Sequence, residues 1–336
     1  KNFLSNDLAN TRTLLHEAIP VTGTICSGTY TDLNIKAYGH GMFQSVYDYP
    51  HLSSSANHIF DVTFGYHSTS GLQLAANSQN SKKQNIYNQM AQVLVGYDTT
   101  GSIKRFTNSA GTEITDALFV NFARLLTKDE IKKGSFSLTA MTGGTQAAPD
   151  LAMVITDTSG AAGYRVDSPA GEYGYLYDAS GKEKGNLYYQ AGIAILSGGT
   201  VFNFGSAADP NVFGAVATTG DATSFVTLAT GSAIKEIADG FRNKLSNLSF
   251  NNTTELNSTI YFCRVNHNDF NYSSNPTYLS GSKLRVKTMA ADAPVSYLTT
   301  VGLYSADNEL LAVAKLSEPL RKSSDTELTL RVRLDY

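Results

Sequence analysis

The sequence contains no tryptophan, two cysteines and few charged residues. Asp, Glu, Lys and Arg together make up 16% of the chain, against about 25% in ordinary soluble domains. The net charge is −3 and no block of like charge stands out, which argues against a protein that neutralises nucleic-acid phosphates, because such binding needs clustered Lys and Arg. No apolar run approaches the roughly 18 residues of a membrane span. We therefore expect no nucleic-acid partner and no membrane.

The cysteines and histidines show no arrangement typical of a disulfide framework or a metal site. Cys26 and Cys263 are far apart, whereas small disulfide frameworks use cysteine densely, so we interpret both as reduced, buried thiols. No histidine spacing matches a signature such as H-E-x-x-H, and only His51 and His58 are considered as opportunistic ligands. His58 and Asp61 should point to opposite faces of a strand. We expect no metal and no cofactor.

Common catalytic motifs are also missing. The sequence has no G-x-S-x-G elbow. "GYDTTGSIK" has the glycine spacing of a phosphate loop, but Ser102 stands where that motif requires Lys, so we interpret the segment as a turn. Glu172 and Asp178 in "SPAGEYGYLYD" could form a glycosidase pair beside a sugar groove, although a hairpin with alternating tyrosines is the interpretation we favour. We predict that the chain is not an enzyme.

The chain is rich instead in Ser, Thr, Asn, Gly and Tyr. It has 19 tyrosines, and this mixture favours strands, turns and interfaces. A length of 336 residues exceeds one typical domain, so we expect two or three. The expected division is an N-terminal α+β region at 1–140, a β-rich middle domain at 141–230, and a C-terminal helix plus antiparallel β-sandwich at 231–336.

Alternation of apolar and polar residues predicts many strands. "HIFDVTFGY" places Phe60, Val62, Phe64 and Tyr66 on one apolar face. "LAMVITD", "GYRVDS", "YGYLYD" and "NLYYQAGIAILSGG" are strand-like runs separated by turn signals, with the spacing of about 10 residues that suggests a sandwich. "TELTLRVRLDY" closes the chain as a strictly alternating strand, with the residues from Leu328 to Tyr336 at every second position facing inward.

Apolar spacing of three and four residues predicts helices. One lies in "SKKQNIYNQMAQVLVGYD" with Ser81 as its N-cap, and another in "GSAIKEIADGFRNKLSNL" with Ser232 as N-cap and Leu245 at the end of its apolar face. "NDLANTRTLLHEA" predicts a shorter helix that stops before Pro20. "ALFVNFARLLTKDEIKKGSFSLTA" fits a helix, or a strand, short helical turn and strand, and we favour the second. The expected fold class is mainly β, with antiparallel β-sandwich domains and two or three amphipathic helices (α+β).

Near the C-terminus, "YLTTVGLY" and "ELLAVAKL" predict two strands joined by the turn "SADN". Both strands are apolar on both faces. A hairpin of this kind belongs inside a sandwich, or between a sheet and a covering layer.

Three segments carry a resemblance to a known family. "NSKKQNIYNQMAQVLVGYD", "FVNFARLLTKDEIKKGSFSL" and "SYLTTVGLYSADNELLAVAKLSEPLRKSSDTELTLRVRLDY" resemble virion structural proteins of T4-like contractile-tailed bacteriophages, especially of the cyanophage type. "VGLYSADNELLAVAKL" is also similar to a hairpin of tail-fibre attachment domains, although Asn308 and Glu309 stand where that pattern has Asp-Gly. The resemblance implies a component of the tail, neck or baseplate, located in a virion assembled in the host cytoplasm, and it carries over no catalytic residue.

A virion subunit would bind other copies of itself and other virion proteins, as a homo-oligomer in a symmetric assembly. The candidate interface residues are Phe270, Tyr272 and Tyr278 in the loop "NHNDFNYSSNPTYLSGSK", and Tyr173 and Tyr175 in "YGYLYD". Packing of the loop aromatics on their own core is the alternative. "TSGLQLAANSQNSKK" is a second candidate contact loop. The competing hypothesis is a receptor- or carbohydrate-binding module on the same particle, against which the absence of tryptophan counts.

Overall fold

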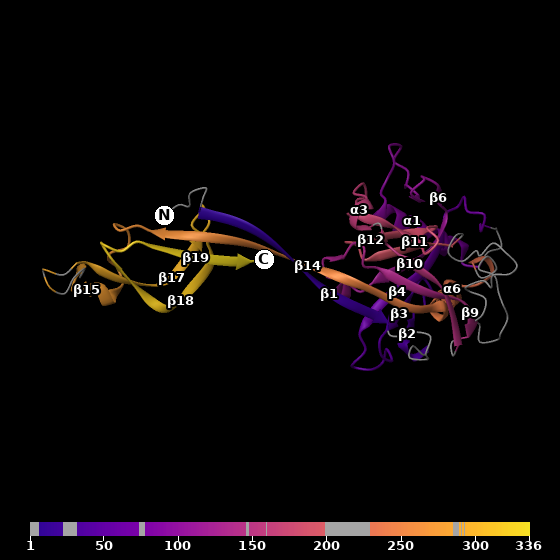
Figure 1. The fold of residues 1–336 in the computed structure, drawn as a ribbon, viewed down its shortest axis with the longest axis horizontal. Helices are drawn as coiled ribbons and strands as arrows, with labels where there is room; N and C mark the ends of the chain where they lie inside the picture. Colours follow the sequence, from indigo (N-terminus) through magenta and orange to yellow (C-terminus); the bar gives the residue numbers. More distant parts are fainter. Residues whose placement is uncertain are drawn as a thin grey trace. The chain divides into compact units, whose positions relative to one another are not determined.

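A computed structural model of the chain describes residues 7–22, 32–73, 78–145, 148–158, 160–198, 229–284, 289, 291 and 293–336. The chain divides into two compact units (Figure 1). We call Leu15–Thr254 the central unit, and Lys1–Leu14 together with Glu255–Tyr336 the terminal unit. The fold is mainly β, with a large antiparallel sheet and several helices, which confirms the expected α+β class.

This division differs from the three consecutive ranges expected from the sequence. Helix α6 (Ile234–Lys244), assigned there to the C-terminal domain, belongs to the central unit. Strands β1 (Leu8–Thr22) and β14 (Leu245–Val265) both continue across the boundary between the units. The boundary therefore lies inside strands, where no Gly- or Pro-rich linker marks it.

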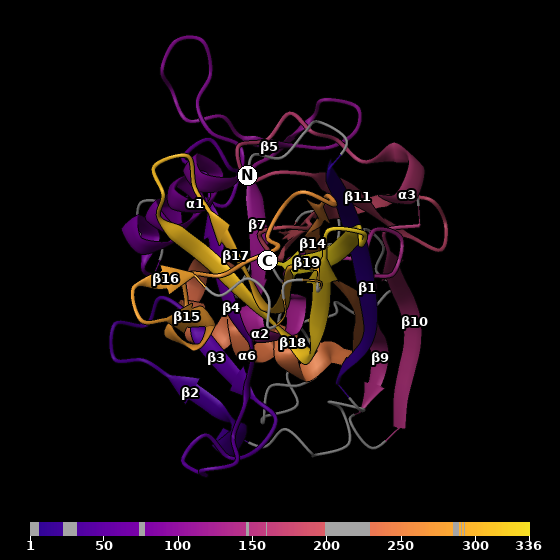
Figure 2. The same ribbon diagram turned by 90° about the vertical axis from the view of Figure 1, so that its left-hand side faces the viewer.

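The central unit is built on one large sheet. From β14, its order is β9-β10-β11-β12-β13-β7-β4-β3-β2, with β1 on the other side of β14. The bounds of these strands are β2 Ile35–Ala37, β3 Gln44–Tyr47, β4 His58–Tyr66, β7 Asp116–Phe122, β9 Ser137–Thr145, β10 Ala148–Thr156, β11 Tyr173–Asp178, β12 Glu183–Tyr188 and β13 Ile193–Ser197. Strands β9 and β10 form an antiparallel pair that lies side by side in Figures 1 and 2.

Smaller elements complete this unit. They are the strands β5 Phe106–Thr107, β6 Glu113–Ile114 and β8 Glu130–Ile131, the helices α1 Asn80–Leu94, α2 Arg124–Thr127 and α3 Gly160–Gly163, and the 3₁₀ turn Asp32–Asn34. The order β7, α2, β8, β9 contains the strand, short helical turn and strand predicted for "ALFVNFARLLTKDEIKKGSFSLTA", with the two-residue strand β8 added between the turn and β9. Among the residues described, no helix has both the length and the apolar content needed to cross a membrane.

Two secondary-structure predictions were wrong. From Leu8 onward, "NDLANTRTLLHEA" lies in strand β1, because this part pairs with β14 in the sheet and a sheet partner overrides a weak local helical pattern. "GYRVDS" is not a strand: it supplies only an isolated bridge between Arg165 and Tyr173. Cys26 lies outside the described residues, so its interpretation as a reduced, buried thiol stays a prediction.

The two longer helices are confirmed, but their caps differ from those predicted. The N-cap of α1 is Gln79 rather than Ser81, and the N-cap of α6 is Ala233 rather than Ser232. The backbone N–H of Ala233 donates to Glu236 Oε2 at 2.9 Å, so a carboxylate one turn into the helix satisfies the helix start. Leu245 is the first residue of β14 and not the last apolar position of α6.

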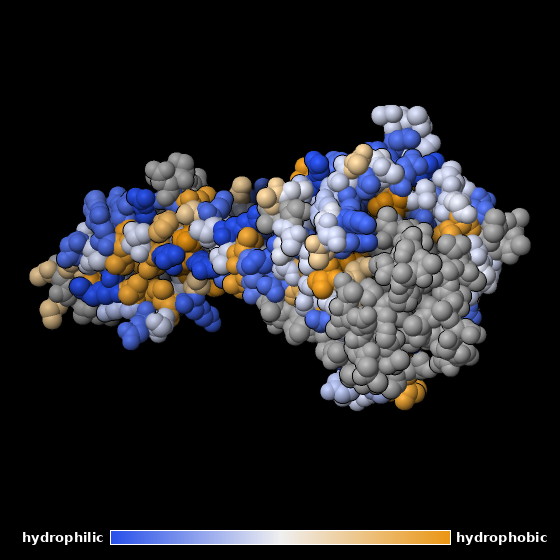
Figure 3. Space-filling view, turned by 45° about the vertical axis from the view of Figure 1, so that its right-hand side comes forward, coloured by the Kyte–Doolittle hydropathy of each residue, from blue (hydrophilic) through white to orange (hydrophobic). Residues whose placement is uncertain are grey.

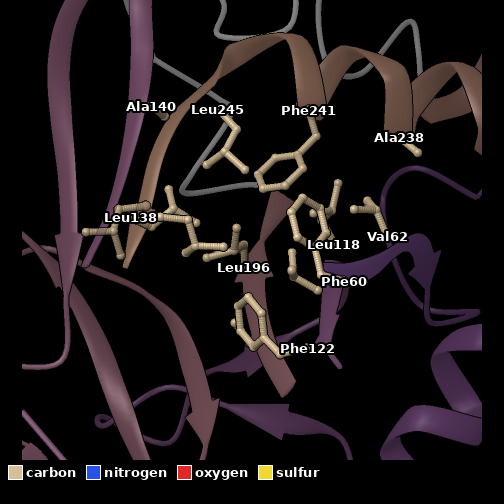
Figure 4. Close-up of a cluster of buried hydrophobic side chains, with 14 of the residues drawn as sticks. Phe60, Val62, Leu118, Phe122, Leu138, Ala140, Leu196, Ala238, Phe241 and Leu245 are labelled. Carbon is tan, nitrogen blue, oxygen red and sulfur yellow. The ribbon is translucent and has the colours of Figure 1, made fainter. Parts of the chain in front are cut away.

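The centre of the sheet is buried on both faces, and β7 shows this residue by residue. Leu118 and Phe122 belong to a core cluster that α6 covers, where Phe241 points at the sheet (Figure 4). Phe119, on the other face, packs in a second cluster with Ile86 and Tyr87 of α1. A strand with both faces buried is apolar almost throughout, as "ALFVNF" is.

Gly65 of β4 permits the close approach of α1 to this sheet. A Cβ atom at this position would lie 2.6 Å from the carbonyl oxygen of Lys83 and 2.7 Å from the backbone N of Tyr87. Both are backbone atoms of a packed helix, so they cannot move aside as a flexible side chain would. The requirement for glycine here comes from the helix backbone and not from the conformation of β4.

We predict that Gly65→Ala destabilises the protein by about 1–3 kcal/mol, the usual cost of overpacking a core. Chemical denaturation should show the change as a lower midpoint. Gly71→Ala is the matched control, because no atom lies within 4 Å of the Cβ it would add. Equal stability of the two variants would show that α1 does not pack against β4 at this distance.

Lys83 is a buried cation that links α1 to the segment before α6. Its side chain is fully buried, and its Nζ donates to the carbonyl oxygens of Ala229 at 2.7 Å and Ser232 at 2.8 Å. Burial lowers the pKa of Lys83 to about 8, an effect that the charge of Glu236 partly opposes. An ammonium group held by neutral carbonyls keeps the segment in place at the cost of desolvation.

This pKa predicts a stability that rises with pH. Between pH 8 and 9.5 the folded state releases the Lys83 proton while the unfolded lysine, with its ordinary pKa of 10.5, keeps it. The unfolded state then binds more protons, so the free energy of unfolding increases, by at most about 1.4 kcal/mol per pH unit. Denaturation of the wild type and of Lys83→Met across this range should show the free energy of unfolding of the wild type increasing relative to that of the variant, because other titrating groups affect both proteins alike. If the free energies of unfolding of the two proteins change with pH in parallel, the lowered pKa of Lys83 is contradicted.

Candidate interaction surface

The terminal unit contains two β layers. One includes β14 with its antiparallel partner β19 (Leu328–Asp335), and the other is the hairpin of β17 (Val295–Tyr304) and β18 (Leu310–Ser323). A cavity of about 260 Å³ is lined by residues of β14, β17 and β19, among them Phe262, Leu298 and Leu330. The hairpin therefore faces the sheet, as the layers of a small sandwich do. Two further strands, β15 (Leu279–Ser280) and β16 (Lys283–Leu284), pair with each other.

The prediction that both faces of the hairpin are buried was wrong. Leu303 is only 5% exposed, but four apolar side chains near the tip are more than half exposed: Tyr304 at 60%, Leu310 at 54%, Leu311 at 67% and Val313 at 51%. We call these four residues the hairpin surface. Figure 3 shows apolar side chains in orange exposed on this unit among polar ones. One face of the hairpin packs inward, and within the described residues no layer covers the other.

Local geometry brings the residues of the hairpin surface together. Tyr304 is opposite Leu310 and Gly302 is opposite Val313, while Leu311 occupies a bulge between the paired positions. A Cβ atom at Gly302 would lie 2.9 Å from the Tyr304 ring and 3.5 Å from Leu310 Cδ1. Both side chains therefore lie over the glycine, which makes the exposed apolar surface continuous.

The turn between β17 and β18, which carries the hairpin surface, is held by several hydrogen bonds. The backbone N–H of Ser305 donates to the carbonyl oxygen of Glu309 at 2.9 Å, and Ser305 Oγ accepts the N–H groups of Asp307 at 3.2 Å and Glu309 at 3.1 Å. Asn308 adopts a positive φ of 63°, a conformation that Asn tolerates better than most residues. The predicted "SADN" turn is confirmed, and it holds the apolar tip in one conformation.

The three loop aromatics lie in the same unit as the hairpin. Phe270 is 53% exposed and Tyr272 is 60% exposed, while Tyr278, in the 3₁₀ turn Pro276–Tyr278, is half-buried and accepts the N–H of Tyr297 at 3.2 Å. Ser296 Oγ donates to the carbonyl oxygen of Phe270. This loop is therefore anchored to β17, with Phe270 and Tyr272 presented at the surface.

Tyr173 and Tyr175 lie in the central unit and are not part of this surface. Tyr175 is only 9% exposed. Tyr173 stacks on Tyr188 with 5.0 Å between ring centroids and meets Tyr175 edge-on at 5.9 Å. Burial raises the pKa of both Tyr173 and Tyr188, so each ring stays neutral. These tyrosines form a packed aromatic group beside a polar cleft of about 740 Å³, whose lining also includes Asp167 and Arg105.

Sequence reasoning missed a buried lysine that supports the loop. Lys322 of β18 is fully buried, and its Nζ donates to the carbonyl oxygen of His267 at 3.0 Å, to Asn271 Oδ1 at 2.7 Å and to the carbonyl oxygen of Ser323 at 2.6 Å. The "LRKSS" pattern contains no signal for this, because lysine is almost always exposed. Lys322 connects the aromatic loop to the hairpin.

The cavity between the layers contains the second cysteine of the sequence. Cys263 is half-buried with a free thiol, and burial, aided by the charge of Asp7, raises its pKa. Asp7 itself lies 2.6 Å from Arg264 Nε. A protonated thiol in an apolar cavity packs as a small apolar group.

The two acidic residues considered for catalysis both have structural partners. Glu172 Oε2 lies 2.5 Å from Lys133 Nζ. Asp178 Oδ2 lies 3.5 Å from Lys184 Nζ, and Asp178 Oδ1 accepts the backbone N–H groups of Ser180 and Lys182, both at 2.9 Å. Asp178 thus closes the β11–β12 turn, which is the hairpin interpretation of "SPAGEYGYLYD". "GYDTTGSIK" is likewise a turn, closed by Asp98 through the N–H of Ser102 at 2.9 Å.

The prediction that His58 and Asp61 point to opposite faces was wrong. His58 Nε2 lies 2.8 Å from Asp61 Oδ1. The pairing of β3 with β4 slips between Val46 and Tyr47, which places one extra residue in β4 between the two side chains. Such a bulge reverses the alternation of a strand. In the described part of the chain, no group of three or more His, Cys, Asp or Glu side chains has the geometry to hold a metal ion.

Comparison with protein-family models, with curated proteins and with solved structures finds no match for this chain.

We predict that Lys322→Met destabilises the terminal unit by about 1–3 kcal/mol, because it leaves buried oxygen acceptors without their donor. Hydrogen exchange of the amides around His267 and Asn271 should accelerate first. Lys315→Met is the matched control, since Lys315 is an exposed residue of the same strand. Unchanged exchange in Lys322→Met would mean that the loop is held by its other contacts.

Proposed function

We propose that this chain is a non-enzymatic structural subunit of a tailed bacteriophage particle, located in the tail, neck or baseplate of a virion assembled in the host cytoplasm. The subunit joins its neighbours through the hairpin surface of the terminal unit. Its partners are other copies of itself and other virion proteins, arranged with the symmetry of the particle.

The hairpin surface is the observation that carries this proposal. Tyr304 and Leu310 lie together over Gly302, which is opposite Val313, and Leu311 occupies the adjoining bulge; all four apolar side chains are more than half exposed. Contiguous exposed apolar surface of this kind is typical of protein–protein contact sites. The turn from Ser305 to Glu309 already holds these residues in place, so a partner would bind them with little loss of conformational entropy.

Composition and sequence resemblance support the same proposal. A chain with 16% charged residues and 19 tyrosines suits contact with neighbouring proteins, because interface cores are depleted in charge and enriched in Tyr. The segments that resemble phage virion proteins include α1 and the whole hairpin. Phe270 and Tyr272, exposed on the loop that Lys322 anchors, extend the available contact area.

A second candidate function is carbohydrate or receptor binding on the particle, for which the polar cleft of the central unit is the favouring observation. Tyr173 offers an aromatic ring, and Asp167 and Arg105 offer polar groups, in a cleft of about 740 Å³. Sugars use stacking on rings together with hydrogen bonds. A glycan array with the purified chain, repeated with Tyr173→Ala, separates the two functions: specific binding lost in the variant favours this second one.

The proposed function predicts that charge on the hairpin surface blocks incorporation into particles. Leu311→Glu and Val313→Glu should lower the amount of chain recovered with gradient-purified particles by at least about tenfold, since burying an unpaired carboxylate disfavours the contact strongly. Both sites are exposed, so the variants should fold normally. Mass spectrometry of the particles measures the recovery.

Ser54→Glu provides the control, because it adds the same charge at an exposed position of the central unit. Its recovery should equal that of the wild type. Finding the wild-type chain only outside particles, or finding the hairpin variants at wild-type levels within them, would refute the proposed function.

A further inference from the structure

Strand β19 forms one edge of the sheet in the terminal unit. It pairs with β14 from Val265↔Leu328 to Ser258↔Asp335 without any interruption of register. Among the described residues, no strand pairs with its other edge. An edge of this kind presents a row of backbone N–H and C=O groups to any added strand.

The hydrogen bonds at the end of β19 show which residues present these groups. Tyr336 and Asn257 exchange both backbone hydrogen bonds, at 2.8 and 3.2 Å. In an antiparallel ladder the residues that bond to one neighbour alternate with those that face the other side. The even-numbered residues of β19 therefore bond to β14, and Thr329, Arg331 and Arg333 direct their N–H and C=O groups to the open edge.

Apart from the charged side chains of Arg331 and Arg333, this edge lacks the features that usually prevent strand addition. Strand β18 contains Pro319, and its pairing with β17 has two register shifts. Strand β2, the edge at the far end of the large sheet, has only 3 residues. A proline, irregular pairing and a short length each make it less favourable to add another strand at an edge. Strand β19 has 8 residues with no proline, glycine or bulge, so its backbone is regular enough to accept another strand.

The side chains of β19 limit how a second strand can join. Leu328, Leu330, Val332 and Leu334 are at least partly buried, while Thr329, Arg331 and Arg333 are exposed. A second copy of β19 must keep its apolar residues on the same face, so only registers that pair odd with odd positions are allowed. A two-fold axis through Arg331 would place that arginine opposite itself. An axis through Val332 would place Arg331 opposite Arg333.

We propose that the N-terminal part of β19 pairs antiparallel with the same segment of a second copy of this chain, about a two-fold axis at Thr329. Glu327 extends β19 (Leu328–Asp335) by one residue in this ladder, which runs from Glu327 to Arg331 in both copies. In this register Glu327 of each copy lies opposite Arg331 of the other, and the two Thr329 residues face each other. Leu328 lies opposite Leu330 of the second copy, which continues the apolar face across the axis.

Three features of the chain favour this register. Opposite charges and Thr–Thr pairs directly across a ladder are stabilising, whereas like charges are not. An axis at Leu330 would instead use Arg333, whose guanidinium is already bonded to Asp335 at 2.6 Å and to Ser258 at 3.0 Å. Glu327 is 69% exposed in its side chain and has only a 3.4 Å contact with His267, so it can turn to the second copy.

The pairing deepens the proposed function, on which it rests, by naming a second copy as the partner at one surface of the subunit. An isologous contact of this type closes at two copies. The hairpin surface is a separate part of the terminal unit and remains for other neighbours.

Sedimentation equilibrium of the full chain tests the pairing. The wild type should show a concentration-dependent dimer. Arg331→Glu and Glu327→Arg should each weaken the dimer by about tenfold, because each variant places like charges opposite each other twice. The double variant Glu327→Arg with Arg331→Glu restores opposite charges and should return the dissociation constant to within about threefold of the wild type.

Thr329→Pro tests the backbone directly. It removes an N–H group that faces the open edge and none that bonds to β14, so the dimer should be lost while circular dichroism keeps its wild-type form. Thr329→Val retains the N–H and is the matched control.

A wild type that stays monomeric at its highest soluble concentration overturns the pairing, as does a double variant no tighter than the single ones. If Thr329→Pro unfolds the chain, the charge-swap set alone decides. Leu311→Glu, on the hairpin surface, should leave the dimer unchanged. Loss of particle recovery in Leu311→Glu together with a monomeric wild type would therefore overturn the pairing and leave the proposed function standing.

Discussion

The backbone hydrogen bonding of strand β14 is the constraint on which both units depend. Its 21 residues pair with β9 and β8 at one end and with β19 at the other. Because side chains alternate along a strand, a slip of one residue in the regular pairing with β19 would exchange inward- and outward-facing side chains there. The two ends of β14 also bury side chains in different places, Leu248 and Phe250 in the central core and Val265 in the terminal unit. The same strand also aligns β19, and so determines which residues of β19 face the open edge.

Much of the fold could be predicted from periodicity, and the failures have specific physical causes. The helical spacing of Ile234, Ile237 and Phe241 and the alternation in "TELTLRVRLDY" identified α6 and β19, since both depend only on local pattern. The contact between His58 and Asp61 could not be predicted, because a bulge set by the partner strand β3 changes the alternation. The segment "NDLANTRTLLHEA" is a strand because of β14, a neighbour more than 200 residues away. The unit boundary lies within strands, where composition does not change. For the candidate surface, the sequence identified the hairpin and its turn, but an apolar strand pattern does not show whether a second layer covers it.

Lys83 in the central unit and Lys322 in the terminal unit connect neighbouring segments in the same way. Each is fully buried, and each donates to oxygen acceptors of a neighbouring segment, with no carboxylate bonded to it in the described part of the chain. A buried carboxylate would have compensated the charge, but it would also have required its own hydrogen bonds. Backbone carbonyls supply the negative end of a dipole at no such cost, and they are abundant where a chain changes direction. As a result, Lys83 holds the start of α6 against α1, and Lys322 holds the aromatic loop against the hairpin. Lysine is rarely buried, so neither position could be identified from residue type.

The chemistry of the terminal unit suggests how one small β unit can serve two kinds of neighbour. The hairpin surface is apolar and formed by side chains, so it selects a partner by shape and can accept a protein of unrelated sequence. The edge of β19 offers backbone groups, which bind any strand, and only the positions of Glu327 and Arg331 give it selectivity. An antiparallel strand that carries Glu and Arg four residues apart is complementary to itself about the residue midway between them. A heterologous partner would need to reproduce this spacing in reverse, whereas a second copy has it without further adaptation. Self-complementarity therefore favours a second copy at the β19 edge, and under the proposed function the hairpin surface remains for other neighbours.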